Sequence, residues 1–258
     1  MPSPTALRLA LLVCDTPADS IRCKHGDYPI LFANIFNEVC PTGLKIEWKF
    51  FDVCKQEYPS LPDVIDGKYD GIVISGSTSS AYKDEPWILK LVEFVKTVRA
   101  APRVKIIGVC FGHQIIARAA GGRCIRNPNG WERLNQVHQD HVPDLPPKFH
   151  SLATTAPHTP IHALVSDDNR CLTIQGHPEI GRAMVRDLLE YRRELGTVPR
   201  DYADSQVSIL DKQGPDMEDT WLVRQFIDFL QGKLQLEDDS VTPDTGSAHG
   251  PNVKIGYD

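Results

Sequence analysis

A single cysteine, Cys110, stands between two glycines at the point where a run of β-forming residues gives way to a helical pattern. The segment IIGVCFGHQ (106–114) predicts a strand over 104–109 followed by a helix over 111–120. The small residues Gly108 and Gly112 permit a sharp turn, which leaves the side chain at its apex exposed above the sheet. A thiolate presented in this way can act as a nucleophile when a base lies beside it.

A second segment, LTIQGHPEI (172–180), offers the base and an acid to orient it. Pro178 favours an extended backbone at His177, and residues two apart on an extended chain project to the same side. His177 and Glu179 are therefore expected to lie together, with the carboxylate fixing one tautomer of the imidazole and stabilising its cation. With Cys110 they make a nucleophilic triad. A surface turn is the competing interpretation of the HPE tripeptide.

A third segment, VISGSTSSAY (73–82), follows another expected strand. A glycine-rich turn at Gly76 can point backbone N–H groups into the site, and together with the N–H of Phe111 it would form an oxyanion hole. A plain solvated loop is the alternative for this turn. Gln114, on the first turn after the cysteine, either faces a substrate or caps backbone groups, and both interpretations stay open.

The elements that position these residues follow from hydrophobic periodicity. Strand-like runs alternate with helical ones, which predicts an α/β fold with a mostly parallel sheet and helices on both faces. Ligands of such sheets bind at the carboxyl ends of strands, where Gly76 and Cys110 fall. The expected strands cover 7–14, 44–53, 69–76, 104–109 and 172–175, with further short apolar runs at 148–155 and 161–166. The expected helices cover 28–39, 84–101, 111–120, 180–195 and 215–234.

Composition limits the classes of partner and compartment. The chain has 258 residues with a formal charge of −6, which argues against nucleic acid or an acidic membrane surface as the main partner. No apolar run approaches the length of a membrane span, and the first apolar run is interpreted as a buried strand rather than an export signal. One domain is expected over 1–234, and the polar segment 235–258 is expected to be a disordered tail.

The seven cysteines form an odd set with no CxxC pair, so we expect reduced thiols in a cytoplasmic protein. The segment HQDH (138–141) places His138, Asp140 and His141 within four residues, which is poor geometry for a metal site. Neither a metal nor an organic cofactor is therefore predicted.

The three motifs ISGS, GVCFGHQ and QGHPE, in this order, resemble those of class I glutamine amidotransferase domains, and the likeness covers about residues 7–195. Within that superfamily, DEPWILKLVEFV and CFGHQIIARAAGG are most similar to the free-standing branch, which includes GMP-synthase-like proteins and plant γ-glutamyl peptidases. The resemblance implies a flavodoxin-like sheet, a triad of Cys110, His177 and Glu179, oxyanion donors at Gly76 and Phe111, and Gln114, His138 and Asp140 near the glutamyl group.

The activity implied by the resemblance is cleavage of the γ-amide of glutamine or a γ-glutamyl compound through a glutamyl thioester. The alternatives are a subunit that supplies ammonia to a separate synthetase chain, and a non-catalytic regulatory protein. The last is kept because only residues 133–137 separate NPNGWE (127–132) from HQDH, where the family usually carries a few short strands. A segment shortened by about two or three strands can leave the triad intact beside an open or misformed pocket.

Overall fold

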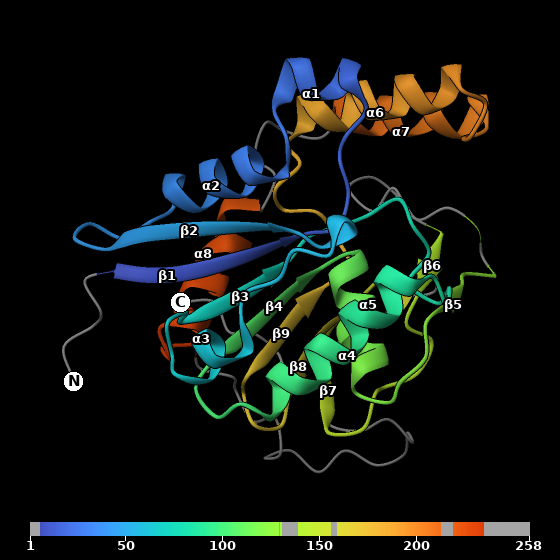
Figure 1. Cartoon of the computed structure of the whole chain (residues 1–258). Coiled ribbons are helices and arrows are strands. Elements are labelled where there is room, and N and C mark those ends of the chain that lie inside the picture. The colour runs from blue at the N-terminus through green and yellow to red at the C-terminus, as the bar shows by residue number, and fades with distance from the viewer. Residues whose placement is uncertain (1–5, 129, 131–138, 156–158, 213–218, 235–258) are drawn as a thin grey trace, which may run out of the picture.

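Seven strands of the computed structural model form one sheet in the order β2-β1-β3-β4-β9-β8-β7 (Figure 1). The structure describes residues 6–128, 130, 139–155, 159–212 and 219–234, so segment 133–137, His138 and the tail 235–258 lie outside the described residues. The strands are β1 (Ala6–Val13), β2 (Lys45–Asp52), β3 (Gly71–Ile74), β4 (Lys105–Val109), β7 (Phe149–Thr155), β8 (Thr159–Ser166) and β9 (Cys171–Ile174).

The sheet is mostly parallel. Strands β2, β1, β3, β4 and β9 run parallel to their neighbours, in the order of a flavodoxin-like sheet, and β8 and β7 extend it as an antiparallel hairpin. The predicted α/β class and flavodoxin-like order are confirmed. The strand order reverses between β1 and β3, and this is the point where such sheets bind ligands.

Helices cover both faces of this sheet, as the alternation predicted. Side chains of β1 alternate between the faces: Leu9 and Leu11 pack with α2 and α8, whereas Ala10 and Leu12 pack with α4 and α5. The helices are α1 (Asp19–His25), α2 (Tyr28–Glu38), α3 (Leu61–Ile65), α4 (Pro86–Ala100), α5 (Phe111–Ala119), α6 (Arg182–Glu194), α7 (Arg200–Lys212) and α8 (Asp219–Leu230), with a 3₁₀ turn at Val53–Lys55.

Three helices, α1, α6 and α7, stand apart from the sheet and form a helical cap (Figure 1). Buried side chains from all three make a separate hydrophobic cluster that includes Ile21, Val185 and Leu210. A hydrogen bond of 2.7 Å between His25 Nε2 and Asp187 Oδ2 also joins α1 to α6. The prediction located α6 but missed α1 and α7: α1 has only seven residues, and most residues of α7 are polar.

The flanks of the short segment 133–137 come together. Strands β5 (Ile125–Arg126) and β6 (Asp140–His141) pair antiparallel as a small second sheet, with Arg126 opposite Asp140. The chain on either side of the expected deletion is therefore held in register, beside the carboxyl ends of the main strands.

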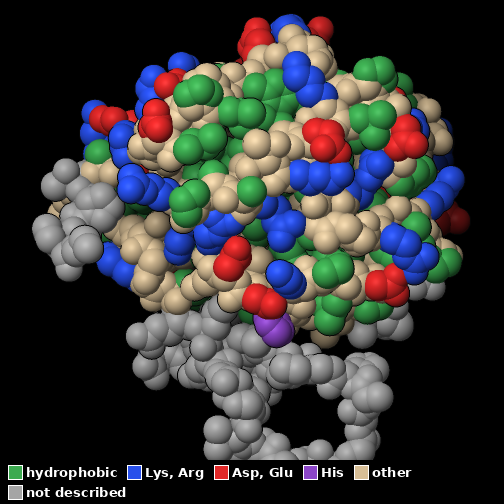
Figure 2. All heavy atoms as spheres, turned by 60° about the horizontal axis from the view of Figure 1, so that its bottom comes forward, with side chains coloured by type: hydrophobic (Ala, Val, Ile, Leu, Met, Phe, Trp, Pro, Cys, Tyr) green, Lys and Arg blue, Asp and Glu red, His purple; other side chains and the backbone are tan. Residues whose placement is uncertain are grey.

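The outer surface of the described residues mixes charges of both signs. Figure 2 shows acidic and basic side chains interspersed with apolar ones over the face that it presents. Within the described ranges, no helix combines the length and the apolar character needed to cross a membrane. All seven cysteines lie in described segments, and all are free thiols.

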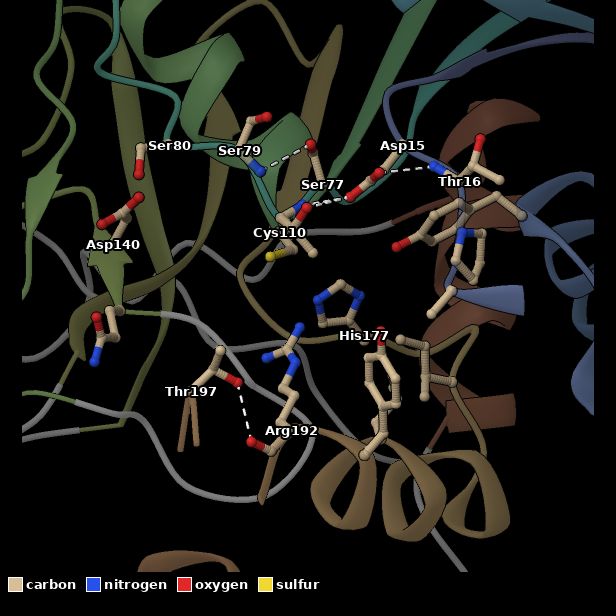
Figure 3. Close-up of a pocket in the computed structure, with 18 of the residues that line it drawn as sticks. Asp15, Thr16, Ser77, Ser79, Ser80, Cys110, Asp140, His177, Arg192 and Thr197 are labelled. Atoms are coloured by element: carbon tan, nitrogen blue, oxygen red, sulfur yellow. Dashed lines mark hydrogen bonds between the residues drawn. The ribbon is translucent and has the colours of Figure 1, made fainter. Parts of the chain in front are cut away.

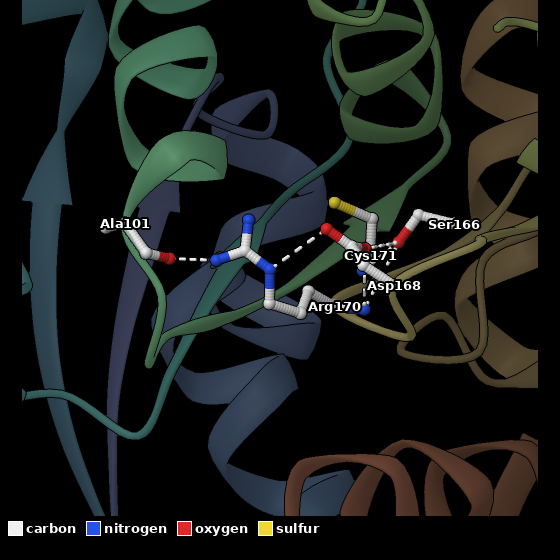
Figure 4. A network of polar contacts seen from close by, with 5 residues as sticks. All are labelled: Ala101, Ser166, Asp168, Arg170 and Cys171. Atoms are coloured by element: carbon white, nitrogen blue, oxygen red, sulfur yellow. Dashed lines mark hydrogen bonds and ion pairs between the residues drawn. The ribbon is translucent and has the colours of Figure 1, made fainter. Parts of the chain in front are cut away.

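A polar network at the amino end of β9 fixes the antiparallel hairpin to the parallel part of the sheet (Figure 4). Arg170 donates through its guanidinium to the carbonyl oxygen of Ala101 and, at 3.1 Å, to Asp168 Oδ2. Ser166 donates from its hydroxyl to Asp168 Oδ1 at 2.6 Å and accepts from the Cys171 N–H at 2.9 Å. These bonds join the β8–β9 turn to the α4–β4 loop.

Replacing Arg170 by methionine is expected to lower the free energy of unfolding by about 1–2 kcal/mol, because the guanidinium is largely buried and a carbonyl loses a charged donor. Urea unfolding would measure the change. The matched control is Arg123→Met, which removes an ion pair with Asp144 whose side chains are 67% and 61% exposed, and should cost about 0.5 kcal/mol or less. Equal losses in the two variants would contradict a stabilising role for the network.

Candidate active site

The turn at Cys110 is strained and tightly packed. Cys110 has a φ of +51°, a conformation that residues other than glycine rarely adopt. A Cβ on Gly108 would lie 2.6 Å from Ile116 Cδ1, and a Cβ on Gly112 would collide with the carbonyl oxygen of Ile74. Both glycines are thus needed for the close approach of α5 to β3 and β4, as the sequence predicted. The turn leaves Cys110 at the amino end of α5, lining a cavity. The expectation of an exposed side chain is wrong, since Cys110 is only 3% exposed and is reached through this cavity.

His177 and Glu179 lie together, as expected from their spacing. His177 Nδ1 is 2.9 Å from Glu179 Oε1, and the side chain of Glu179 is fully buried. The other oxygen, Oε2, has no hydrogen-bond partner among the described residues. The carboxylate is therefore directed at the imidazole alone, which leaves the other ring nitrogen to face the site.

Gly76 is in close contact with both His177 and Cys110. A Cβ at this position would lie 2.6 Å from His177 Cε1 and 3.6 Å from Cys110 Cβ. Gly76 is not held in a positive φ, so the absence of a side chain serves the approach of the imidazole. The structure thus brings together residues that follow β3, β4 and β9.

The electrostatics of His177 favour its cation. Burial by itself lowers the pKa of His177, but the charges of Cys110 and Glu179 and hydrogen bonds with both side chains outweigh that effect and raise the pKa to about 10. A cationic imidazole stabilises a thiolate next to it, and so does the amino end of a helix. The arrangement therefore places an imidazolium proton beside the sulfur of Cys110.

The cavity in front of Cys110 has a volume of about 590 Å³ and is shown in Figure 3. Four residues predicted from the sequence line it, namely Cys110, Gln114, Asp140 and His177. Glu179 and Phe111 lie behind this wall, and His138 lies outside the described residues. Residues on both flanks of segment 133–137, Arg126 and Asp140, take part in the lining.

Gln114 caps a backbone group, which is one of the two roles that the sequence left open. Its amide nitrogen donates to the carbonyl oxygen of Asp140 at 3.0 Å and to Gln175 Oε1 at 3.1 Å, so it caps a backbone group. It also borders the cavity. Burial raises the pKa of Asp140 despite a hydrogen bond from Ser80, toward which its carboxylate points in Figure 3. Gln114 thus fixes the strand that presents Asp140 to the cavity.

The turn after β3 is anchored rather than loose. Asp15, which follows β1, accepts hydrogen bonds of 2.7 Å from both the N–H and the hydroxyl of Thr78. Ser77 accepts from the Ser79 N–H at 3.1 Å, as drawn in Figure 3. This segment therefore borders the candidate site, since Ser77, Thr78, Ser79 and Ser80 all line the cavity.

Several cavity residues were missed by sequence reasoning. Asp15 and Thr16 follow the first strand, so the rule that ligands bind at carboxyl strand ends was a signal that pointed to them. Tyr28 and Arg192 had no comparable signal, because each reaches the site from a helix packed there by the tertiary fold. Within the described ranges, no group of three or more His, Cys, Asp or Glu side chains is arranged to hold a metal ion.

Two buried histidines near the turn at Cys110 are held neutral. Burial lowers the pKa of His113 to about 3, with a smaller contribution from the nearby His162, and burial lowers the pKa of His162 to about 4. His113 Nδ1 lies 2.8 Å from Thr173 Oγ1 of β9, so this pair joins α5 to the strand that leads to His177.

Acid should therefore remove the stability that these two neutral histidines contribute. In the unfolded chain both histidines have a pKa of about 6.5 and bind protons below that pH, whereas in the folded chain they stay neutral. Their contribution to the free energy of unfolding is therefore complete above about pH 6.5 and is lost as the pH falls. Between pH 6 and 5 the two histidines together are expected to remove about 2 kcal/mol from the free energy of unfolding. Urea titrations at both pH values would measure the loss, and His162→Asn should halve it; an unchanged loss in that variant would contradict the assignment.

The chain is similar to known glutamine amidotransferases in sequence. Residues 30–136 match the family described as glutamine amidotransferase class-I. A glutamine amidotransferase-like protein of Schizosaccharomyces pombe is 34% identical over 212 residues, covering 72% of this chain and 84% of that protein. Gamma-glutamyl peptidase 4 of Arabidopsis thaliana is 30% identical over 234 residues, covering 80% of this chain and 89% of the peptidase.

Solved structures share the fold. A glutamine amidotransferase from Thermotoga maritima superposes with a TM-score of 0.62 at 18% identity, covering 87% of this chain and 98% of that one. A glutamine amidotransferase from Methylobacillus flagellatus gives 0.60 at 17% identity, with coverages of 96% and 99%. Taken with the sequence identities, these similarities show that the chain belongs to the class I glutamine amidotransferase family.

Proposed function

We propose that this protein is a cysteine-dependent amidohydrolase that cleaves the γ-amide of a γ-glutamyl compound. One observation carries the proposal: Cys110 stands on a strained turn at the wall of a cavity, in contact with an imidazole that is itself held at 2.9 Å by a buried carboxylate. The names of relatives, which include a gamma-glutamyl peptidase, support a γ-glutamyl substrate.

In the first half-reaction, the Cys110 thiolate attacks the γ-carbonyl carbon and forms a carbon–sulfur bond. The oxygen that becomes negative is stabilised by the backbone N–H groups of Phe111 and Gly76. Phe111 is the first residue of α5, where no earlier turn accepts its N–H. Each such donor is typically worth about 3–4 kcal/mol to the transition state. His177 then donates its proton to the departing nitrogen as the carbon–nitrogen bond breaks.

In the second half-reaction, neutral His177 takes a proton from water, and the hydroxide attacks the thioester carbon. The carbon–sulfur bond breaks, glutamate leaves, and Cys110 is again a thiolate beside an imidazolium. The net reaction consumes one water and one amide and releases glutamate with an amine or ammonia. Glu179 keeps His177 oriented through both steps and is a positioning residue.

The test is release of amine or ammonia from γ-glutamyl-leucine and from glutamine by the purified full chain. The proposal expects turnover that Cys110→Ala abolishes, and labelling of Cys110 by an electrophilic glutamine analogue in preference to the exposed Cys23. Turnover equal to that of Cys110→Ala, or equal labelling of both thiols, would overturn it. Glutamine cleavage that appears only after a synthetase is co-purified would support the ammonia-supplying alternative instead.

A further inference from the structure

The cavity has two chemically different walls. One is polar, with the carboxylates of Asp15 and Asp140, the cation of Arg126 next to Asp140, and a row of hydroxyls from the turn after β3. The other comes from the helical cap and combines apolar side chains with a single cation, Arg192. The apolar members of this wall are Ala18, Ile180, Met184, Leu188 and Leu195.

Arg192 is directed from α6 into the cavity, toward Cys110 (Figure 3). Burial lowers the pKa of Arg192, against the opposing effects of Tyr28, Cys110 and Asp15, so its guanidinium lies among groups of the site. The helix that carries it is fixed at this end, because the carbonyl oxygen of Arg192 accepts from the Thr197 hydroxyl at 3.1 Å and from its N–H at 3.0 Å.

The spacing of α6 makes the cap wall a continuous stripe. Met184, Leu188 and Arg192 follow one another at intervals of four residues and therefore share one face of the helix. An amino acid with an apolar side chain and a free carboxylate complements such a stripe, since a guanidinium matches a carboxylate in a planar, two-pronged hydrogen bond. Ammonia, the leaving group of glutamine, has neither group.

We propose that Arg192 binds the carboxylate of the leaving group, so that the cap selects γ-glutamyl peptides with a free carboxylate after the scissile bond. This inference rests on the proposed function. The glutamyl group, attached through its γ-carbon to the reacting centre above Cys110, extends toward Gln114 and Asp140, where its ammonium meets a carboxylate. The leaving group extends the opposite way, to the cap. Arg192 is a specificity residue in this arrangement.

The experiment compares γ-glutamyl-leucine with γ-glutamyl-leucinamide, which differ only in the charge that Arg192 would bind. The full chain is expected to favour the acid over the amide by about tenfold or more in kcat/KM, the effect of one charge-assisted hydrogen-bonded pair. Arg192→Gln should bring that ratio close to one, and Arg192→Lys should keep part of it. The matched control is Arg193→Gln, which alters the next residue on α6, an arginine paired with Asp204 instead.

Two outcomes would overturn the inference: a wild-type ratio near one, or an Arg192→Gln variant that loses the acid, the amide and glutamine equally. The second result would place Arg192 at the carboxylate of the glutamyl group itself. Calorimetry of the same two ligands with Cys110→Ala measures binding without hydrolysis, and so tests this inference separately from the proposed function. Acid-selective binding that Arg192→Gln removes, without turnover by the wild type, would uphold the subsite while the proposed function fails.

Discussion

Replacing Glu179 by glutamine is expected to lower kcat/KM for γ-glutamyl-leucine about 10²–10⁴-fold, as loss of the orienting carboxylate does in other triads. The carboxylate is fully buried and directed at His177 Nδ1, so its charge acts on the imidazolium with little screening. A neutral amide at 179 no longer stabilises the cation, and its NH₂ group favours the tautomer with an unprotonated Nδ1. Steady-state kinetics would measure the loss.

The pH profile distinguishes this role from simple damage to the fold. Glu179 contributes to the raised pKa of His177, so Glu179→Gln should lower that pKa and move the alkaline limb of kcat/KM toward neutral pH. Glu179→Asp keeps the charge and should recover part of the rate. The control is Glu190→Gln, which changes an exposed carboxylate on α6. A Glu179→Gln enzyme within threefold of wild type, with an unmoved profile, would exclude a positioning role.

Replacing Gly76 by alanine is expected to cost about 100-fold or more in kcat/KM, since a catalytic group displaced by about 1 Å loses that much. The added Cβ would stand 2.6 Å from His177 Cε1 and 3.3 Å from Nδ1, so the imidazole must move away from the sulfur. The backbone N–H of residue 76 survives the substitution. The loss would therefore report the position of His177 rather than removal of an oxyanion donor.

Gly181→Ala is the matched control, because a Cβ there meets no atom within 4 Å and the residue lies at a φ of −69°. It should retain nearly full activity. The rate at which Gly76→Ala is labelled at Cys110 gives a second measurement, since a displaced imidazolium stabilises less thiolate at neutral pH. Wild-type kinetics and labelling in Gly76→Ala would show that the contact between Gly76 and His177 is not required.

The grouping of Cys110, His177 and Glu179 in the candidate site was predictable because its signals are local. Gly108 and Gly112 are required because the start of α5 packs closely against β4 and the neighbouring strand β3. Pro178 favours an extended backbone at His177. Buried parallel strands appear as continuous apolar runs, so β3, β4 and β9 were also found, and their carboxyl ends meet at one edge. The sequence by itself therefore determined the fold class and the residues that form the turn at Cys110.

Only the tertiary structure decided what surrounds that centre. Helix α7 packs against α6, and the periodicity within a helix does not identify which distant helix its buried face will contact. The position of Arg192 follows from that packing: RR at 192–193 looks like a solvated helix end, yet one arginine pairs with Asp204 and the other enters the cavity. Selectivity for a leaving group depends on contacts between distant segments, and these form only when the cap is placed over the sheet.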